Sequence, residues 1–335
     1  MIALQKKDCW LGCALFLLLV AFLISPWDYA FTKWLEAHPI LWFSSFMDRS
    51  FFEGNKFGGG DFATIYMIAG ILLYITAWLP RSPNRLRQWR PELGLIVASS
   101  LITTVYVVHG LKWTIGRVRP LSVQGNGALP FTRWFEAGPY NLLDGFFSGS
   151  FPSGHTATIT IFLTLAYILA FHRRWNRYRL GLFIGLTTIG LAYLMAMARS
   201  MNHSHFATDG MAIIPLTWLI IHFLFFRILN IPQQQELLAH SSQVPKLPAC
   251  WELRLCGLGL FLVLGLMAIS LGIRGWHGGA ALPAVALCCT GLVLTIFFAG
   301  KVWGFYSPIA EIIAQATKTT TDPLPQQGNS SSDSL

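Results

Sequence analysis

The sequence predicts an all-α protein, a polytopic membrane bundle of about eight transmembrane helices. Two observations carry this prediction. The chain is 54% hydrophobic and only 12% charged, against roughly 25% charged residues in soluble domains. Apolar runs also recur along it, and a helix of about 20 such residues crosses a hydrocarbon core of roughly 30 Å. A soluble core of this size would need more polar surface than the sequence supplies.

The expected spans follow from the apolar runs in chain order. We place them at about 9–25, 62–79, 93–111, 155–171, 180–197, 210–227, 255–273 and 281–300. The first run follows a basic start, as in a signal peptide, but no small-x-small cleavage site follows it. It is therefore expected to remain as the first helix.

The basic residues lie mostly in alternate links between these runs. The links RSPNRLRQWRPE and HRRWNRYR contain four arginines each, and further Lys and Arg residues follow the sixth and eighth runs. Because basic loops stay in the cytoplasm, this pattern predicts that both termini are cytoplasmic. The net charge of +9 is therefore interpreted as a topology signal, and no nucleic-acid partner is expected.

Three other features concern segments outside the spans. Residues 31–47 are rich in Trp and Phe, which fits either an amphipathic segment in the outer interface or a plain extracytoplasmic loop. The tail from 318 to 335 has low complexity and is expected to be disordered. The six cysteines show no CxxC spacing, so neither a disulfide framework nor a zinc site is predicted.

The links on the opposite side break the expected charge bias. They should avoid basic residues, yet they contain Lys112, Arg117, Arg119, Arg133 and Arg199. Histidines occur in the same links, at positions 155, 203 and 205. Several cations gathered at one membrane face suggest a site for an anion.

The spacing of these residues indicates which of them act together. Lys112 and Arg119 are seven apart, two helical turns, and so share a face of a continuing helix that Pro120 ends. Arg117 points elsewhere and is interpreted as an interfacial or phosphate-headgroup arginine. Ser153 is a plausible N-cap, which would leave the amides of Gly154 and His155 at the positive end of a helix.

His205 and Asp209 are four apart and would lie one above the other on a helix. The carboxylate can then hold one imidazole nitrogen while the other is free to attack. Cations, a helix N-terminus and two histidines are what phosphoryl transfer requires, since its transition state spreads negative charge over several oxygens. A metal cluster of His203, His205 and Asp209 is not favoured, because the HxH spacing does not fit one helix face.

The pattern as a whole resembles the three-part signature of the type 2 phosphatidic acid phosphatase (PAP2) superfamily. The first part is Lys112 with Arg119-Pro120, the second is Pro152-Ser153-Gly154-His155, and the third is Arg199, His205 and Asp209. The superfamily includes membrane lipid phosphatases and soluble vanadium haloperoxidases. The resemblance covers roughly residues 93–228, which predicts a catalytic core there, with residues 1–92 and 229–317 as additional membrane segments.

The resemblance implies a role for each residue of the signature. His205 would be the nucleophile that forms a phosphohistidine, Asp209 would orient it, and His155 would protonate the leaving group. The remaining positions would hold the phosphoryl oxygens: Lys112, Arg119, Ser153, Gly154 and Arg199. Neither a metal nor another cofactor is implied. The site would face the periplasm of a bacterial inner membrane.

Two positions depart from the family pattern. Ala198 stands where a serine is common, and His203 stands where glycine is frequent. His203 is therefore a candidate for substrate selectivity, as is Arg117, although His203 could also be a surface interfacial residue.

The expected activity is hydrolysis of a lipid phosphate or diphosphate, of the undecaprenyl diphosphate, phosphatidylglycerophosphate, phosphatidate or lipid A type. The alternatives are phosphate transfer from a polyprenyl diphosphate to another lipid, and lipid transport. The partners expected are thus a lipid substrate and the bilayer, and neither the lipid nor the oligomeric state can be told from the sequence.

Overall fold

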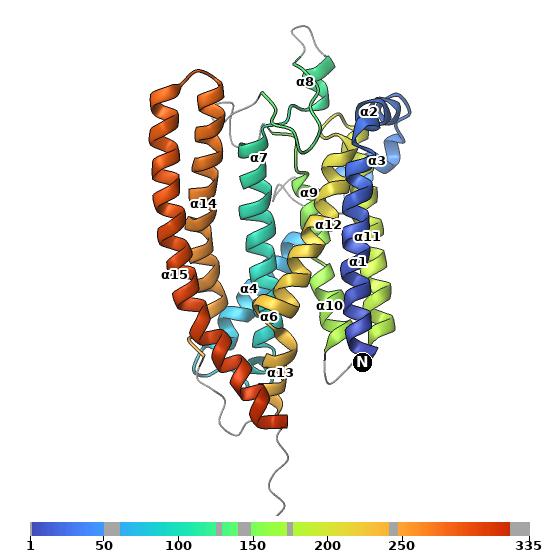
Figure 1. Cartoon of the computed structure of the whole chain (residues 1–335). Coiled ribbons are helices and arrows are strands. Elements are labelled where there is room, and N and C mark those ends of the chain that lie inside the picture. Colours follow the sequence, from blue (N-terminus) through green and yellow to red (C-terminus); the bar gives the residue numbers. More distant parts are fainter. Residues whose placement is uncertain are drawn as a thin grey trace, which may run out of the picture.

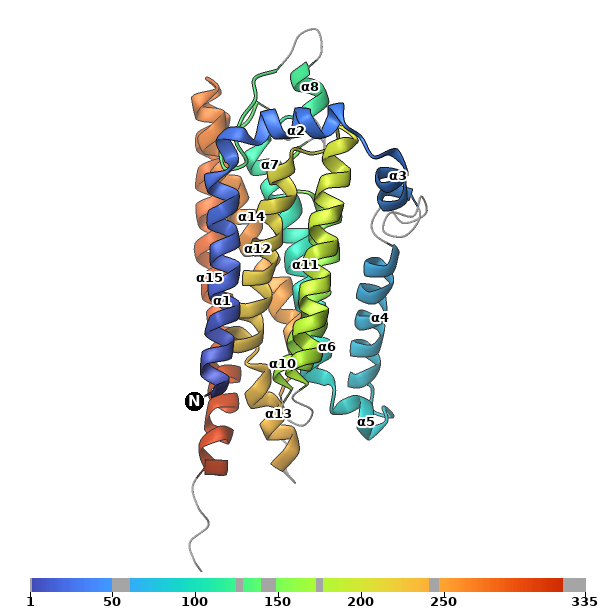
Figure 2. The same ribbon diagram turned by 90° about the vertical axis from the view of Figure 1, so that its right-hand side faces the viewer.

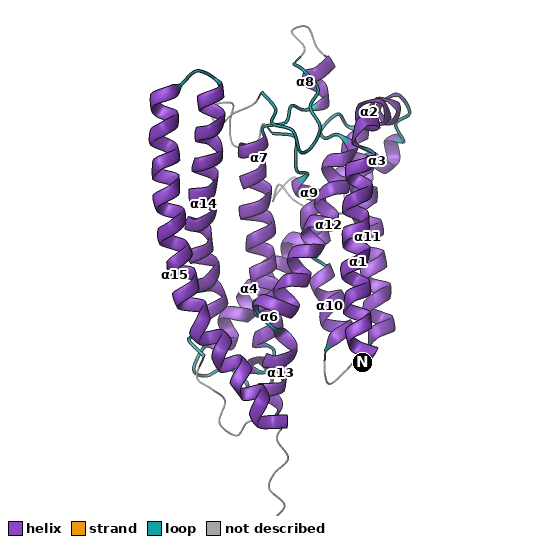
Figure 3. Ribbon diagram, in the orientation of Figure 1, coloured by secondary structure: helices purple, strands orange, loops and turns teal. Residues whose placement is uncertain are grey.

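A computed structural model describes residues 2–49, 61–124, 129–139, 149–172, 177–240 and 247–321. Every regular element in these ranges is helical, which confirms the all-α prediction (Figure 3). The elements are α1 (Ile2–Leu23), α2 (Asp28–Ala37), α3 (Leu41–Arg49), α4 (Asp61–Trp78), α5 (Asn84–Arg87), α6 (Arg90–Ser100), the π-helix η2 (Leu101–His109), α7 (Gly110–Ile115), α8 (Pro120–Gln124), α9 (Gly154–Thr160), α10 (Leu163–Phe171), α11 (Tyr178–Met201), α12 (Ala207–Phe223), the π-helix η4 (Leu224–Ile228), α13 (Ile231–His240), α14 (Trp251–His277) and α15 (Ala281–Thr321).

Six helical segments among the described residues are long and apolar enough to cross a membrane. The count becomes seven if Lys6–Leu23 and Ser25–Ala37, which are bent by 43°, form one span. The prediction of about eight spans exceeds this number because Phe62–Trp78 is a shorter apolar helix. At about 1.5 Å per residue it rises roughly 26 Å, less than the hydrocarbon core of roughly 30 Å.

The core of the bundle lies where α6 and η2 meet α10, α12 and η4. Its fully buried side chains include Leu95, Tyr167, Ile221 and Phe225. Trp10 of α1 joins them, with its ring edge-on to Tyr167 at 4.8 Å. Apolar residues on the outer surface of the bundle remain exposed, which fits a surrounding of lipid rather than water.

Helices α14 and α15 form a hairpin at one side of the bundle (Figure 1). Glycines allow these two helices to approach closely, since a Cβ on Gly265 would lie 2.6 Å from Thr295 Oγ1. The helix α15 continues to Thr321, so residues 318–321, which were expected to be disordered, are helical. Residues 322–335 of the predicted tail lie outside the described residues.

The segment at 31–47 forms two short helices, α2 and α3. Figure 2 shows α2 passing over the upper end of the bundle, beyond α11 and α12. Its inner face is buried at Asp28, Thr32 and Leu35, whereas Trp34 is 56% exposed. Its placement in the membrane interface remains a prediction.

The polar residues are positioned by three helix termini at this upper end of the bundle. Helix α7 ends at Gly116, which has φ 62° and donates its amide to Lys112 O at 3.1 Å. Glycine suits this left-handed C-cap because it has no Cβ. The starts of α9 at Gly154 and of α12 at Ala207 lie at the same end (Figure 1).

Candidate active site

A cavity of about 320 Å³ lies between the ends of these helices. Most of the residues singled out in the sequence line it: Lys112, Arg119, Gly154, His155, Arg199 and His205. Thr104, Val108, His109 and Thr158 complete the lining. Residues that are up to 101 positions apart in the chain therefore share one small polar space, as an anion site requires.

The cations of the cavity come from three segments. Lys112 is almost fully buried in α7, and its Nζ donates to Gly149 O at 3.1 Å. Arg119 precedes α8, and Arg199 lies in the last turn of α11. An anion bound here would meet positive charge from several directions, and Coulomb attraction is stronger at a partly enclosed site than in bulk water.

Ser153 lies behind the cavity and is fully buried. It occupies the N-cap of α9 with extended backbone, as expected, but its side chain makes no capping hydrogen bond. Instead its Oγ accepts a hydrogen bond from Thr156 Oγ1 at 3.0 Å. The hydroxyl is thus held by its neighbour in the first turn of the helix.

His205 and Asp209 face each other across the start of α12. His205 Nδ1 lies 3.5 Å from Asp209 Oδ2, and both side chains are buried. This separation exceeds the usual 2.7–3.2 Å of an N–H···O bond, and such contacts often tighten when substrate binds. Because Nδ1 faces the carboxylate, Nε2 is the nitrogen that can attack a ligand in the cavity.

Burial keeps His205 neutral. It lowers the pKa of the imidazole from 6.5 to about 3, although Asp209 opposes this shift and Lys112 and Arg199 add to it. A neutral imidazole has the lone pair that a nucleophile needs. His205 can therefore attack a phosphorus atom without first losing a proton to solvent.

Asp209 is held by several donors at once. Its Oδ2 accepts from Phe206 N at 2.9 Å and from Ser150 Oγ. Its Oδ1 accepts from Arg117 Nη1 at 2.6 Å. Ser150 carried no signal in the sequence, because it precedes the recognised motif and belongs to no periodic pattern.

Arg117, interpreted from the sequence as an interfacial or headgroup residue, is not exposed on the surface of the bundle. Its side chain is fully buried and bonds both Asp209 and Asp28. The rings of Phe131 and Phe206 lie 5.2 Å and 4.3 Å from its guanidinium carbon. It does not line the cavity. Asp28 was missed in the sequence, although it is a lone carboxylate at the end of an apolar run, on the same side as the unexplained arginines.

His203 also lies away from the cavity lining. Its φ is 56°, and its Nδ1 lies 3.1 Å from Glu36 Oε1 of α2, with 44% of its side chain exposed. Glycine adopts this left-handed backbone more readily than histidine, which accounts for the family preference at this position. A role for His203 in selectivity remains a prediction.

His203 and His205, in the loop between α11 and α12, point toward different partners. Within the described residues, no group of three or more His, Cys, Asp or Glu side chains could hold a metal ion. His203 turns to Glu36 and His205 to Asp209.

Comparison with known proteins agrees with this geometry. Residues 93–231 match the family model described as PAP2 superfamily. No curated protein and no solved structure matches the chain. The matched range begins in α6, ends at the start of α13, and contains every residue of the cavity lining. Residues 93–231 therefore form a PAP2 superfamily domain, which follows helices α1–α5 in the chain and precedes most of α13 and the α14–α15 hairpin.

Proposed function

We propose that this protein is an integral membrane phosphatase that hydrolyses a lipid phosphate or diphosphate through a phosphohistidine at His205. One observation carries the proposal: a buried, carboxylate-backed histidine lines the same cavity as Lys112, Arg119 and Arg199. The PAP2 superfamily includes phosphatases, and this arrangement has the parts that phosphoryl transfer needs.

The first half-reaction follows from the positions of the two histidines. His205 Nε2 attacks phosphorus, an N–P bond forms, and the P–O bond to the lipid breaks. His155, protonated, donates its proton to the leaving oxygen. The cations compensate the charge on the remaining phosphoryl oxygens, and Asp209 stabilises the positive ring of His205.

The second half-reaction returns the site to its starting state. Water attacks phosphorus while His155 takes up one of its protons, and the N–P bond breaks. Inorganic phosphate leaves, His205 is again neutral, and His155 is again protonated. Each proton given in the first step is thus recovered in the second.

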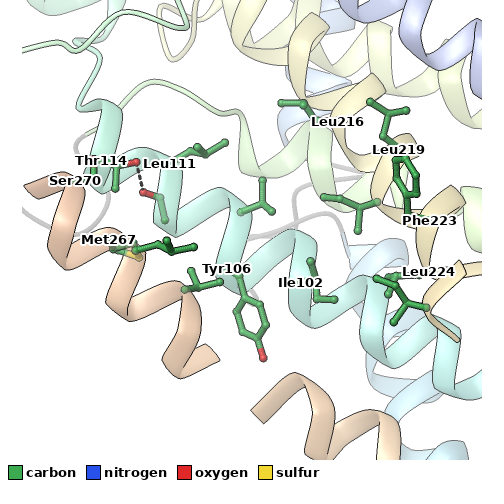
Figure 4. Close-up of a pocket in the computed structure, with 16 residues that line it drawn as sticks. Ile102, Tyr106, Leu111, Thr114, Leu216, Leu219, Phe223, Leu224, Met267 and Ser270 are labelled. Atoms are coloured by element: carbon green, nitrogen blue, oxygen red, sulfur yellow. Dashed lines mark hydrogen bonds between the residues drawn. The ribbon is translucent and has the colours of Figure 1, made fainter. Parts of the chain in front are cut away.

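Two apolar pockets near the polar cavity support the proposal that the substrate is a lipid. A groove of about 650 Å³ lies between η2–α7, α12–η4 and α14, and Figure 4 shows Ile102, Leu219, Phe223 and Met267 around it. A smaller apolar pocket of about 280 Å³ shares Tyr106, Gly110 and Met267 with this groove.

The smaller pocket also shares His109 with the polar cavity. The three spaces therefore follow one another around η2–α7. We infer that a hydrocarbon chain occupies the apolar two while its phosphate lies in the polar cavity.

The charge pattern supports a site that faces the periplasm of a bacterial inner membrane. The arginine-rich link around α5 lies at the lower end of the bundle in Figure 2, whereas α7, which carries Lys112, lies toward the opposite end. If basic links remain in the cytoplasm, the N-terminus, which lies at the lower end, is cytoplasmic too. Transport is not favoured, because transport sites lie near the middle of the membrane.

A phosphate-release assay tests the proposal. Purified protein in detergent would be offered undecaprenyl diphosphate, phosphatidylglycerophosphate, phosphatidate and lipid A in turn, with His205→Ala as the matched inactive control. We expect release from at least one lipid, reduced at least about 1,000-fold in the variant. Labelled phosphate that appears on a second lipid rather than in water would identify a phosphotransferase. Equal release by the variant would contradict the assignment of His205.

A further inference from the structure

Helix α2 lies outside the superfamily domain, yet it holds the start of α12. Ala207 N donates to Thr32 Oγ1 at 3.1 Å, and Thr208 N donates to Asp28 Oδ1 at 3.0 Å. The N-cap residue of α12 is Phe206, whose side chain has no acceptor. The first amides of the helix that carries Asp209 are therefore satisfied by α2.

The contacts of α2 fall on one helical face. Asp28, Thr32 and Glu36 are four residues apart, so their side chains lie in a row. Glu36 continues the row to His203 in the loop before the nucleophile. Asp28 also pairs with Arg117, which in turn pairs with Asp209 behind His205.

Asp28 and Asp209 share one arginine. Arg117 Nη2 donates to Asp28 Oδ2 at 2.7 Å, and Nη1 donates to Asp209 Oδ1 at 2.6 Å. Thr208 Oγ1 donates to Asp28 Oδ2 and accepts from Arg117 Nη1 at 3.2 Å. All three charged side chains are fully buried.

The charges of this trio do not cancel. Arg117 and Asp209 alone would form a neutral pair, with little left to attract a positive imidazole. With Asp28 included, two carboxylates and one guanidinium leave one negative charge in a region shielded from water. That charge lies behind the ring which becomes positive when His205 is phosphorylated.

We propose that Asp28, in the N-terminal helix outside the superfamily domain, is a positioning residue that supplies the excess negative charge behind His205. It acts through Arg117: by pairing with the guanidinium, it leaves the carboxylate of Asp209 to stabilise the phosphorylated imidazole. This role rests on the proposed function, because it concerns the step in which His205 attacks phosphorus. The cap on α12 keeps Asp209 in register while this happens.

Three variants separate charge from shape. Asp28→Asn has the same size and can still accept from Thr208 N, but it lacks the charge. Asp28→Glu keeps the charge and changes the length. Glu36→Gln removes a charge from the same face of α2 that pairs with His203, and so serves as the matched control. Thermal unfolding in detergent checks that each variant is folded.

Two readouts are measured for each variant. The first is kcat and KM for release of phosphate from dioctanoyl phosphatidate. The second is the rate at which diethyl pyrocarbonate modifies His205, followed by mass spectrometry. This second rate reports attack by the same nitrogen and needs no phosphatase activity.

We expect Asp28→Asn to lower kcat and the modification rate about tenfold, which corresponds to about 1.4 kcal/mol in the activation free energy. KM should stay within about twofold of the wild-type value. Asp28→Glu should lose less than Asp28→Asn, and Glu36→Gln should stay within about twofold of the wild type. A purely structural cap predicts the reverse order, with Asn tolerated better than Glu, and that order would overturn the proposal.

Failure of the proposed function gives a different result. If the wild type releases phosphate from none of the lipids, phosphatase activity is refuted. The modification rates of His205 still decide the role of Asp28: a slower rate in Asp28→Asn supports it, and an unchanged rate rules it out.

Discussion

Gly210 is the position where a single methyl group should disturb the site most. It follows Asp209 in α12 and lies against Ala196 of α11. A Cβ added to Gly210 would lie 2.2 Å from Ala196 Cβ and 3.0 Å from Ala196 Cα. We expect Gly210→Ala to lower kcat/KM by about 10- to 100-fold while the protein still folds.

The magnitude follows from how far the helices must move. Ordinary van der Waals contact begins at 3.4 Å, so α11 and α12 would have to separate by roughly 1 Å in a close-packed region. Overpacking of this kind costs about 1–3 kcal/mol. Arg199 lies three residues after Ala196, so the separation would move it relative to Asp209, and displacements of about 1 Å can cost 100-fold in rate.

Phosphate release and thermal unfolding in detergent would be measured together. Gly190→Ala is the matched control, because Gly190 lies on α11 with nothing within 4 Å of an added Cβ, and it should be neutral or slightly stabilising. Pairing Gly210→Ala with Ala196→Gly removes the group that the new methyl meets and should restore part of the activity. The reasoning is refuted if Gly210→Ala is as active as Gly190→Ala.

Three further predictions concern other parts of the molecule. In the unfolded chain His205 becomes protonated below about pH 6.5, whereas in the folded protein its pKa is about 3 and it stays neutral down to that pH. Stability is therefore lost as pH falls through this window, and between pH 7 and 5 the wild type should lose about 2 kcal/mol more than His205→Gln. Equal losses in denaturant titrations would exclude this. Arg274 of α14 donates to Thr114 O and Gly138 O, each at 2.7 Å. Arg274→Met should therefore lower the free energy of unfolding by about 2–3 kcal/mol in the same titrations, and an unchanged midpoint would show that these bonds are dispensable. Leu219→Trp, which fills the apolar groove, should raise KM for a long-chain lipid phosphate but not for p-nitrophenyl phosphate, with exposed Leu194→Trp as control. A rise for both substrates would argue against a chain in the groove.

Much of the fold could be predicted because a bilayer permits few solutions. A spanning segment must satisfy its backbone internally, so each long apolar run is expected to be a helix. The pairing of His205 with Asp209 was predictable for a similar reason, since four residues make one helical turn. Their roles in catalysis remain proposals.

The contacts that join distant segments could not be predicted in this way. Asp28 and Arg117 are separated by 89 positions, and no periodicity relates them. Arg117 appeared interfacial because its only visible context was a basic link, whereas two carboxylates and two aromatic rings enclose it. The nine-residue π-helix Leu101–His109, which supplies cavity residues, also lies in an ordinary apolar run without a sequence signal.

The hydrogen bond between Thr208 N and Asp28 joins residues 180 positions apart, and this has a consequence for biogenesis. Contacts between residues so far apart in sequence form late, after the intervening chain has been synthesised and its helices have packed together. During synthesis, α2 emerges long before the amides that it will cap. His205 therefore acquires the buried charge behind it only once α12 has been inserted beside α1. On the proposed function, a chain interrupted before α12 would have no phosphatase activity.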